Sequence, residues 1–100
     1  MSNYEILLIL NPGLGEAAVN EKIELFSKWV KELGGNIASV DNRGVERLSF
    51  EINKTNQGHF VLIKFDVSAD KVDFLRKEIR LEENFWRYML KKLDTVKVSK

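Results

Sequence analysis

The sequence predicts an α+β domain in which two helices cover one face of a four-stranded antiparallel sheet. Apolar residues recur with the period of a helix in two segments and with strand patterns in four. The segments follow the order strand, helix, strand, strand, helix, strand. Two right-handed strand–helix–strand units in this order place the first and third strands at the centre of the sheet. One hundred residues, 44% of them hydrophobic, suffice for one such domain with its own core.

The first strand and the first helix have the clearest patterns. Residues Tyr4–Leu10 form an apolar run typical of a strand buried on both faces, and Asn11-Pro12-Gly13 ends it as a turn. A helix is predicted from about Glu16 to Leu33, because its apolar residues fall at steps of three and four. Gly34-Gly35 can end this helix. The buried stripe consists of Val19, Ile23, Phe26, Val30 and Leu33, with Trp29 at its edge.

The residue pattern in the middle of the chain predicts a long hairpin. Residues Asn36–Asn53 form an irregular strand in which we expect a bulge or bend at Gly44. Lys54–Gly58 form the predicted hairpin loop, and His59–Val67 return as a strand. Beyond Gly44, one face of the first strand carries Leu48, Phe50 and Ile52. The returning strand directs Val61, Ile63, Phe65 and Val67 to one face and Phe60, Leu62, Lys64 and Asp66 to the other.

The chain closes with a second helix and a strand in which aromatic and basic residues interleave. Ser68 is the expected N-cap of a helix over Ala69–Leu81. The last strand is FWRYMLKKL, Phe85–Leu93, and residues 94–100 form a polar tail that we expect to be flexible. The buried stripe of the helix is Val72, Leu75 and Ile79. Alternation in the strand places Trp86, Tyr88 and Leu90 in the core and Phe85, Arg87, Met89 and Lys91 on the other face.

Together these elements predict one ferredoxin-like β-α-β-β-α-β domain over residues 1–93. The second and fourth strands become the edges of the sheet, and the face without helices is left uncovered. That open face would carry Leu7, Ile9, Phe60 and Leu62, which makes it apolar for a surface in contact with water.

Positive charge is concentrated at the end of the chain. The net charge is only +1, but the residues after Asn84 include five Lys or Arg and a single Asp. A basic end on a near-neutral body suits an anionic partner, although lysines that merely keep a tail solvated give the same count. The chain has no cysteine, which excludes disulfides, zinc–thiolate sites and iron–sulfur clusters. No apolar run is long enough to span a bilayer, and the first ten residues lack a signal-peptide pattern, so we expect a cytosolic protein.

Catalytic patterns are absent from the sequence. His59 is the only histidine; we expect it at the hairpin edge as a surface or turn residue, and alone it cannot hold a metal. Glu82-Glu83 fit a solvated turn, and Gly13-Leu14-Gly15 lacks the other residues of a phosphate loop. Base stacking on the central strands is poorly supported because only Phe60 offers a ring there. Binding of RNA through shape and phosphate contacts remains open, and no cofactor is expected.

Three segments resemble the bacterial small-subunit ribosomal protein S6 family. They are YEILLILNP at the start, GVERLSFEI running into NQGHFVLIKF in the hairpin, and FWRYMLKK at the end, so the similarity spans Tyr4–Lys92. The resemblance implies a ferredoxin-like fold and a structural, non-enzymatic role in the small subunit of the cytoplasmic ribosome. It also implies binding to small-subunit ribosomal RNA as a pair with ribosomal protein S18, without a membrane or DNA partner.

The resemblance also implies which residues could contact RNA. Arg47 and Arg87 fall on basic positions of the family's pattern, and the candidate contacts are Arg47, Arg87, Lys91, Lys92 and Lys54. The chain departs from the pattern where Val45-Glu46 precede Arg47 and where Trp86, not a basic residue, precedes Arg87. The alternative function is a small-molecule sensor or protein-interaction module that homodimerises through the open sheet face. The ribosomal hypothesis instead expects a monomer when the protein is free, and an enzyme ranks third.

Overall fold

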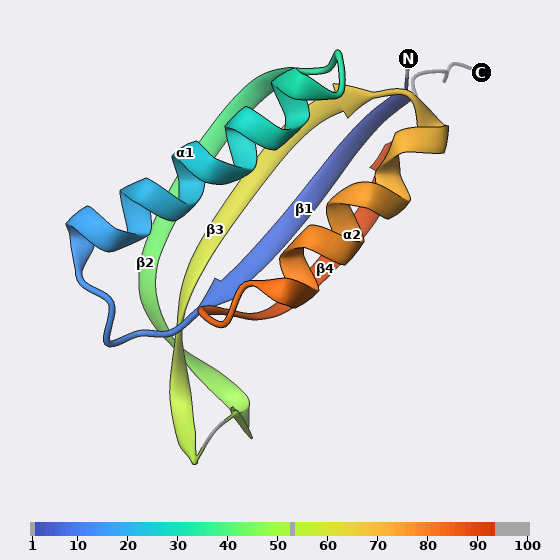
Figure 1. Cartoon of the computed structure of the whole chain (residues 1–100). Coiled ribbons are helices and arrows are strands. Elements are labelled where there is room, and N and C mark those ends of the chain that lie inside the picture. Colours follow the sequence, from blue (N-terminus) through green and yellow to red (C-terminus); the bar gives the residue numbers. More distant parts are fainter. Residues whose placement is uncertain (1, 53, 94–100) are drawn as a thin grey trace.

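A computed structural model describes residues 2–52 and 54–93, and its element order is the predicted one. The strands are β1 (Ser2–Leu10), β2 (Asn36–Ile52), β3 (Thr55–Val67) and β4 (Phe85–Leu93). The helices are α1 (Glu16–Glu32) and α2 (Val72–Leu81), the latter preceded by a 3-10 turn, η1 (Ala69–Lys71). The sheet has the order β2-β3-β1-β4 with antiparallel neighbours, and both helices lie on one of its faces (Figure 1). The ferredoxin-like class and the central places of β1 and β3 are therefore confirmed.

The main core lies between the two helices and the sheet, as the periodicities predicted. Alternate residues of the central strands are fully buried there because successive side chains point to opposite faces. Aromatic rings fill its centre. The ring of Phe26 on α1 meets that of Phe65 edge-on, with the centroids 5.4 Å apart, and the ring of Tyr4 stacks on that of Phe65 with the centroids 5.6 Å apart. The remaining buried members are Ile6, Leu8, Leu10, Val19, Trp29, Val30, Val61, Ile63, Val67, Val72, Leu75, Ile79 and Phe85.

Both helices begin and end close to their predicted limits. α1 ends one residue before the predicted Leu33, and Gly34 follows in the left-handed region with φ of 87°. Ser68 has the extended backbone of a residue before a helix, and its carbonyl accepts the Lys71 N–H at 2.9 Å. Its side chain makes no capping hydrogen bond, so Ser68 marks the helix start through its backbone alone.

The hairpin between β2 and β3 is longer and tighter than predicted. β3 begins at Thr55, which pairs with Ile52, so Thr55–Gly58 belong to the strand and not to a loop. Lys54 turns the chain with φ of 66°, and the predicted strand end at Asn53 lies outside the described residues. The bulge expected at Gly44 is confirmed by a register shift between Asn42 and Gly44 and a φ of 82° at Gly44. Beyond this bulge the hairpin projects past the end of β1 as an arm, residues 45–52 and 54–58 (Figure 1).

A bulge at the start of β4 corrects the predicted faces of that strand. Ile9 pairs with Arg87, whereas Leu10 pairs with Phe85, so Trp86 is an extra residue between two pairs. An extra residue shifts every side chain on one side of it to the opposite face. The alternation assumed for Phe85–Leu93 holds from Arg87 onward and fails before it.

The consequence is that two aromatic residues exchange their predicted places. Phe85 lies in the core, with its ring 6.2 Å from that of Trp29, and Trp86 packs with residues of the open face. The prediction of Trp86 in the core and Phe85 outside is therefore wrong. Tyr88 and Leu90 do pack against the core, as predicted.

His59 is a buried structural residue, which corrects its prediction as a surface or turn histidine. It lies within β3, only 8% exposed, between Leu10 of β1 and Val45 of β2. Its Nε2–H donates a hydrogen bond of 2.6 Å to Oδ1 of Asn42, at the Gly44 bulge. Because the hairpin strands extend further than predicted, a residue expected at their tip lies well inside the sheet.

Candidate nucleic-acid interface

The arm folds over one end of the open sheet face. Leu48 and Ile52 of the arm form a second buried cluster with Ile9 of β1, and Phe60 and Trp86 pack against it. This contact depends on Gly58, because a Cβ at that position would lie 2.6 Å from Cγ2 of Ile9. The open face is apolar, as predicted, but part of it is already covered by the chain itself.

Between the arm and β4 the open face forms a groove of about 470 Å³. Its floor is apolar, and an exposed arginine stands on each side: Arg47 on the arm and Arg87 on β4. The guanidinium of Arg87 lies over the ring of Phe50, 5.7 Å from its centroid, in a cation–π arrangement. Phe50, predicted to share the apolar face of Leu48 and Ile52, is instead 47% exposed. The fold thus brings together the two arginines that the resemblance selected.

The other three predicted contacts lie apart from this groove. Lys91 is on the open face next to Glu5, which pairs with Lys64 on its other side, and it lines a neighbouring hollow of about 370 Å³. Lys92 pairs with the core residue Tyr4 and therefore points to the helix side of the sheet. Lys54 is exposed at the tip of the arm. Three of the five candidates, Arg47, Arg87 and Lys91, consequently share one face.

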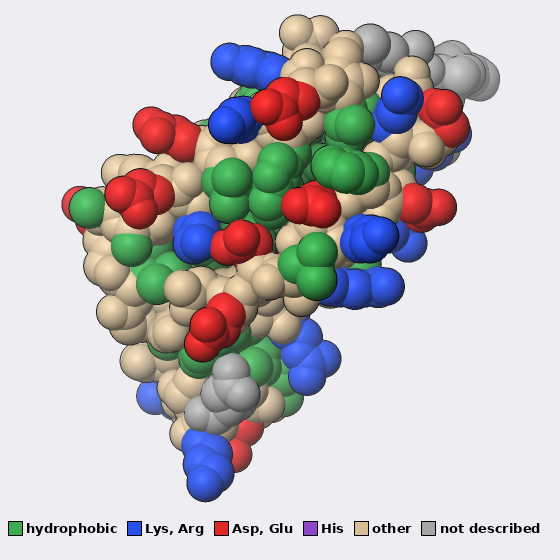
Figure 2. Space-filling view, viewed as in Figure 1, with side chains coloured by type: hydrophobic (Ala, Val, Ile, Leu, Met, Phe, Trp, Pro, Cys, Tyr) green, Lys and Arg blue, Asp and Glu red, His purple; other side chains and the backbone are tan. Residues whose placement is uncertain are grey.

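A further basic residue, Arg80, lies beside β4 and was not among the predicted contacts. It is exposed in the last turn of α2 and lines a hollow of about 460 Å³ at the outer edge of β4. Figure 2 shows Lys and Arg side chains along this side of the molecule, over α2, with Asp and Glu side chains among them. Counting charge only after Asn84 missed Arg80. The feature of the sequence that could have identified Arg80 is its position in the last turn of the second helix, shortly before the basic strand.

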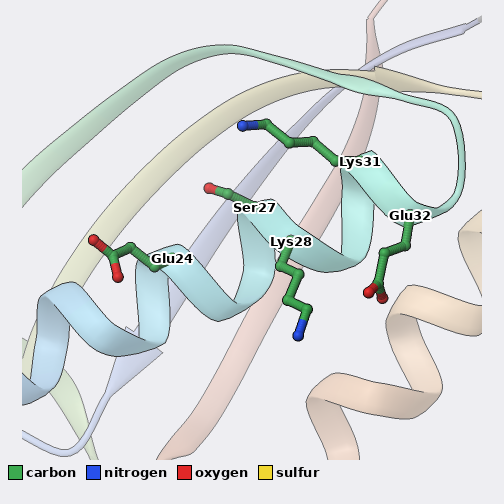
Figure 3. A pocket seen from close by; sticks show the side chains of 5 residues that line it. All are labelled: Glu24, Ser27, Lys28, Lys31 and Glu32. Carbon is green, nitrogen blue, oxygen red and sulfur yellow. The ribbon is translucent and has the colours of Figure 1, made fainter.

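Within the described part of the chain, neither the hollow on α1 nor the acidic and histidine side chains form a metal site. One hollow, of about 460 Å³, is lined by side chains of α1 alone, which point in different directions along the helix (Figure 3). Across residues 2–52 and 54–93, no three His, Asp or Glu side chains come together in a way that would hold a metal ion. In the same part of the chain, no helix is long and apolar enough to cross a membrane.

Comparison with known proteins agrees with this architecture. The family model described as "Ribosomal protein S6" matches residues 3–92. The small ribosomal subunit protein bS6 of Clostridium novyi is 37% identical over 90 residues, which cover 90% of this chain and 95% of that protein. The bS6 protein of Thermus thermophilus is 29% identical, covering 92% and 91% of the two chains. A crystal structure of 30S ribosomal protein S6 from Thermotoga maritima superposes with a TM-score of 0.86 at 24% identity, over 92% of this chain and 87% of that one.

The fold defines a small α+β protein of the ferredoxin-like type, with basic residues at the β4 edge of its sheet. The family match is more specific, because it covers nearly the whole chain. The chain belongs to the ribosomal protein S6 family, and the predicted recognition is confirmed. It is accordingly a ribosomal protein of the small subunit, located in the cytoplasmic ribosome, and not an enzyme.

Proposed function

We propose that this protein binds small-subunit ribosomal RNA as a pair with ribosomal protein S18, through the open face and its β4 edge. The observation that carries the proposal is the meeting of Arg47 and Arg87 at one groove, from segments distant in sequence. Guanidinium groups bind phosphate oxygens in a bidentate manner, and phosphate contacts supply much of the affinity for RNA. An apolar floor between two arginines suits an interface where protein and RNA surfaces meet.

The low net charge of this chain supports binding as a pair. Arg43 is held by Asp41 at 3.3 Å and Lys22 by Glu82 at 2.7 Å, so neither cation is fully available to phosphate. A net charge of +1 gives little long-range attraction to RNA. A partner protein that contributes further cations would raise the affinity without any new contact from this chain.

A salt titration tests the proposal. The protein is titrated, with and without S18, against an RNA fragment from the small-subunit platform at several salt concentrations. Arg47→Gln and Arg87→Gln should each weaken binding and lower the slope of log affinity against log salt by roughly 0.7–0.9 for each phosphate that the variant no longer neutralises. Lys28→Gln, which removes an exposed cation of α1, is the matched control and should change neither quantity. Absent or salt-independent binding by the unmodified pair would contradict the proposal.

Arg87→Ala separates an RNA contact from a structural role. We expect weaker assembly into small subunits with little loss of fold stability, since Arg87 is exposed and its contact with Phe50 is at the surface. Co-sedimentation with small subunits and urea denaturation are measured on the same variant. Unfolding of Arg87→Ala would assign the residue to the fold.

The alternative of a homodimer through the open face is decided by sedimentation. The arm already covers Ile9 and part of that face, which leaves less apolar surface for a second copy. We therefore expect the free protein to sediment as a monomer at micromolar concentration. A tight dimer would favour the sensor or interaction-module function.

A further inference from the structure

The outer edge of β4 carries a second hollow, which shares Arg87 and Tyr88 with the groove on the open face. It has a volume of about 460 Å³ and is lined by Ile79, Arg80, Phe85, Trp86, Arg87 and Tyr88. This volume lies within the roughly 300–1,000 Å³ of small-ligand sites. Among residues 2–52 and 54–93, the side chains that line it are aromatic, cationic or, at Ile79, aliphatic, and none is a carboxylate. Its chemistry therefore fits an anionic ligand with a flat ring.

Trp86 has the properties of a fixed stacking surface. Its side chain is half-buried, since it packs against the cluster of Ile9, Leu48 and Ile52 while also lining the hollow. The bulge between Phe85 and Arg87 holds it in that position at the edge of the sheet. An aromatic ring anchored on one side loses little conformational freedom when a base stacks on it.

Two arginines stand on opposite sides of this tryptophan. Arg80 reaches the hollow from α2, on the helix side of the sheet, whereas the guanidinium of Arg87 lies over Phe50 on the open side. Neither forms an ion pair within residues 2–52 and 54–93. A nucleic-acid strand that crosses the β4 edge would meet positive charge on both sides of Trp86.

We propose that the hollow at the α2–β4 edge binds one unstacked nucleotide of single-stranded RNA, with its base on Trp86 and a flanking phosphate at Arg80. The proposal rests on the RNA-binding function proposed above and specifies the form of RNA at this edge. RNA is favoured over a protein segment because two cations and no carboxylate flank the exposed part of the ring. This site is distinct from the central strands, where stacking residues are few.

Tryptophan emission provides a direct test. The chain has two tryptophans, and Trp29 is 8% exposed in the core, so Trp86 is the one that a ligand can reach. Saturation of the protein–S18 pair with platform RNA should quench the emission of the unmodified protein. The Trp86→Phe variant, in which only Trp29 emits, should give no response. Quenching by S18 alone, with no further change on adding RNA, would assign the edge to the protein partner and overturn the proposal.

Affinity measurements complete the test. Trp86→Leu should weaken RNA binding about ten-fold because it removes the stacking surface, whereas Trp86→Phe should retain most of the affinity. Arg80→Gln should lower the salt slope, and Lys28→Gln again serves as the control. Suppose that the Trp86→Leu variant, paired with S18, binds RNA with full affinity and that RNA does not quench the emission of the unmodified protein. The proposed nucleotide site is then wrong, while the RNA-binding function stands. If no RNA binds at all, the proposed function itself fails.

Discussion

At the scale of single residues, one inserted position determines which aromatic group lies on the open face of the sheet. Because Trp86 is extra in the register between β1 and β4, it lies on the same side as Arg87 instead of alternating with it. The same insertion turns Phe85 into the core, where its ring meets Trp29. An aromatic and a cationic residue are thereby placed next to each other at the sheet edge.

Gly58 permits the close approach of the arm to the sheet. Gly58→Ala should destabilise the fold by about 1–3 kcal/mol, because the new Cβ would lie 2.6 Å from Cγ2 of Ile9. This methyl group is bonded directly to Cβ of Ile9, so it cannot move away without a change of rotamer or of backbone. Urea denaturation measures this change. Gly13→Ala is the matched control: its nearest contact is Oδ1 of Asn11 at 3.4 Å, and its stability should change by less than about 0.5 kcal/mol. Equal urea midpoints for the two variants would show that the approach of the arm to Ile9 does not require glycine at position 58.

Phe50 orients Arg87 without adding charge to the site. Phe50→Ala should reduce RNA affinity several-fold while leaving the salt slope unchanged, since the cation remains but is no longer supported by the ring. The decrease in fold stability should stay below about 1 kcal/mol, as the ring is 47% exposed. Phe74→Ala removes a similarly exposed ring on α2 and is the control. A lower slope for Phe50→Ala would mean that Arg87 loses its phosphate contact without the ring, which would contradict this expectation.

At the scale of elements, the arm is the least supported part of the molecule. The longest break in the pairing of β2 with β3 lies in the arm, between the pair Arg47–Gln57 and the pair Ile52–Thr55. The arm is held against the sheet by one small cluster, whereas β1 is paired on both sides and buried under both helices. β4, which carries Arg87, pairs with β1 without a break from Arg87 to Leu93, so we expect it to be attached more firmly than the arm that carries Arg47.

Hydrogen exchange should resolve this difference. Amides of β1 and β3 between Ile6 and Leu8 and between Val61 and Phe65 should exchange only through global unfolding, because their strands are central and buried. Amides of residues 46–57 should exchange through local opening at a lower free energy. Addition of S18 and RNA should slow the second group selectively. Uniform protection along the whole of β3 in the free protein would contradict this expectation.

A second link between elements joins the two helical units. Nζ of Lys22 on α1 and Oε1 of Glu82, just after α2, are 2.7 Å apart, and both side chains are partly buried. Glu82→Gln should cost about 0.5–1 kcal/mol of stability, because the pair is partly shielded from water. The cost should be smaller at high salt, because the pair is still partly exposed and salt screens it. A double-mutant cycle with Lys22→Gln measures the interaction alone. A coupling energy near zero would make the pair a surface contact without effect on the fold.

At the scale of the whole molecule, the periodicities were sufficient to predict the architecture. Steps of three and four in α1 and alternation in β3 depend only on which face meets the core, and both were confirmed. The bulge at Trp86 could not be predicted in this way, because nothing in FWRYMLKKL distinguishes an inserted residue from a regular one. The register comes from pairing with β1, which a local pattern does not contain. Arg80 was missed for a related reason: its neighbours at the site come from a different element.

The two edges of the sheet differ in how they meet other chains. β2 breaks its register at three places, carries Gly44 with φ of 82° and holds the pair Arg43–Asp41, and such irregularity discourages a foreign strand from adding. β4 pairs regularly from Arg87 to Leu93 and leaves its outer edge open. Arg87, Lys91 and Lys92 place positive charge along this edge, and like charges on two copies would oppose edge-to-edge pairing. Neutralising all three should therefore favour association of free copies through β4.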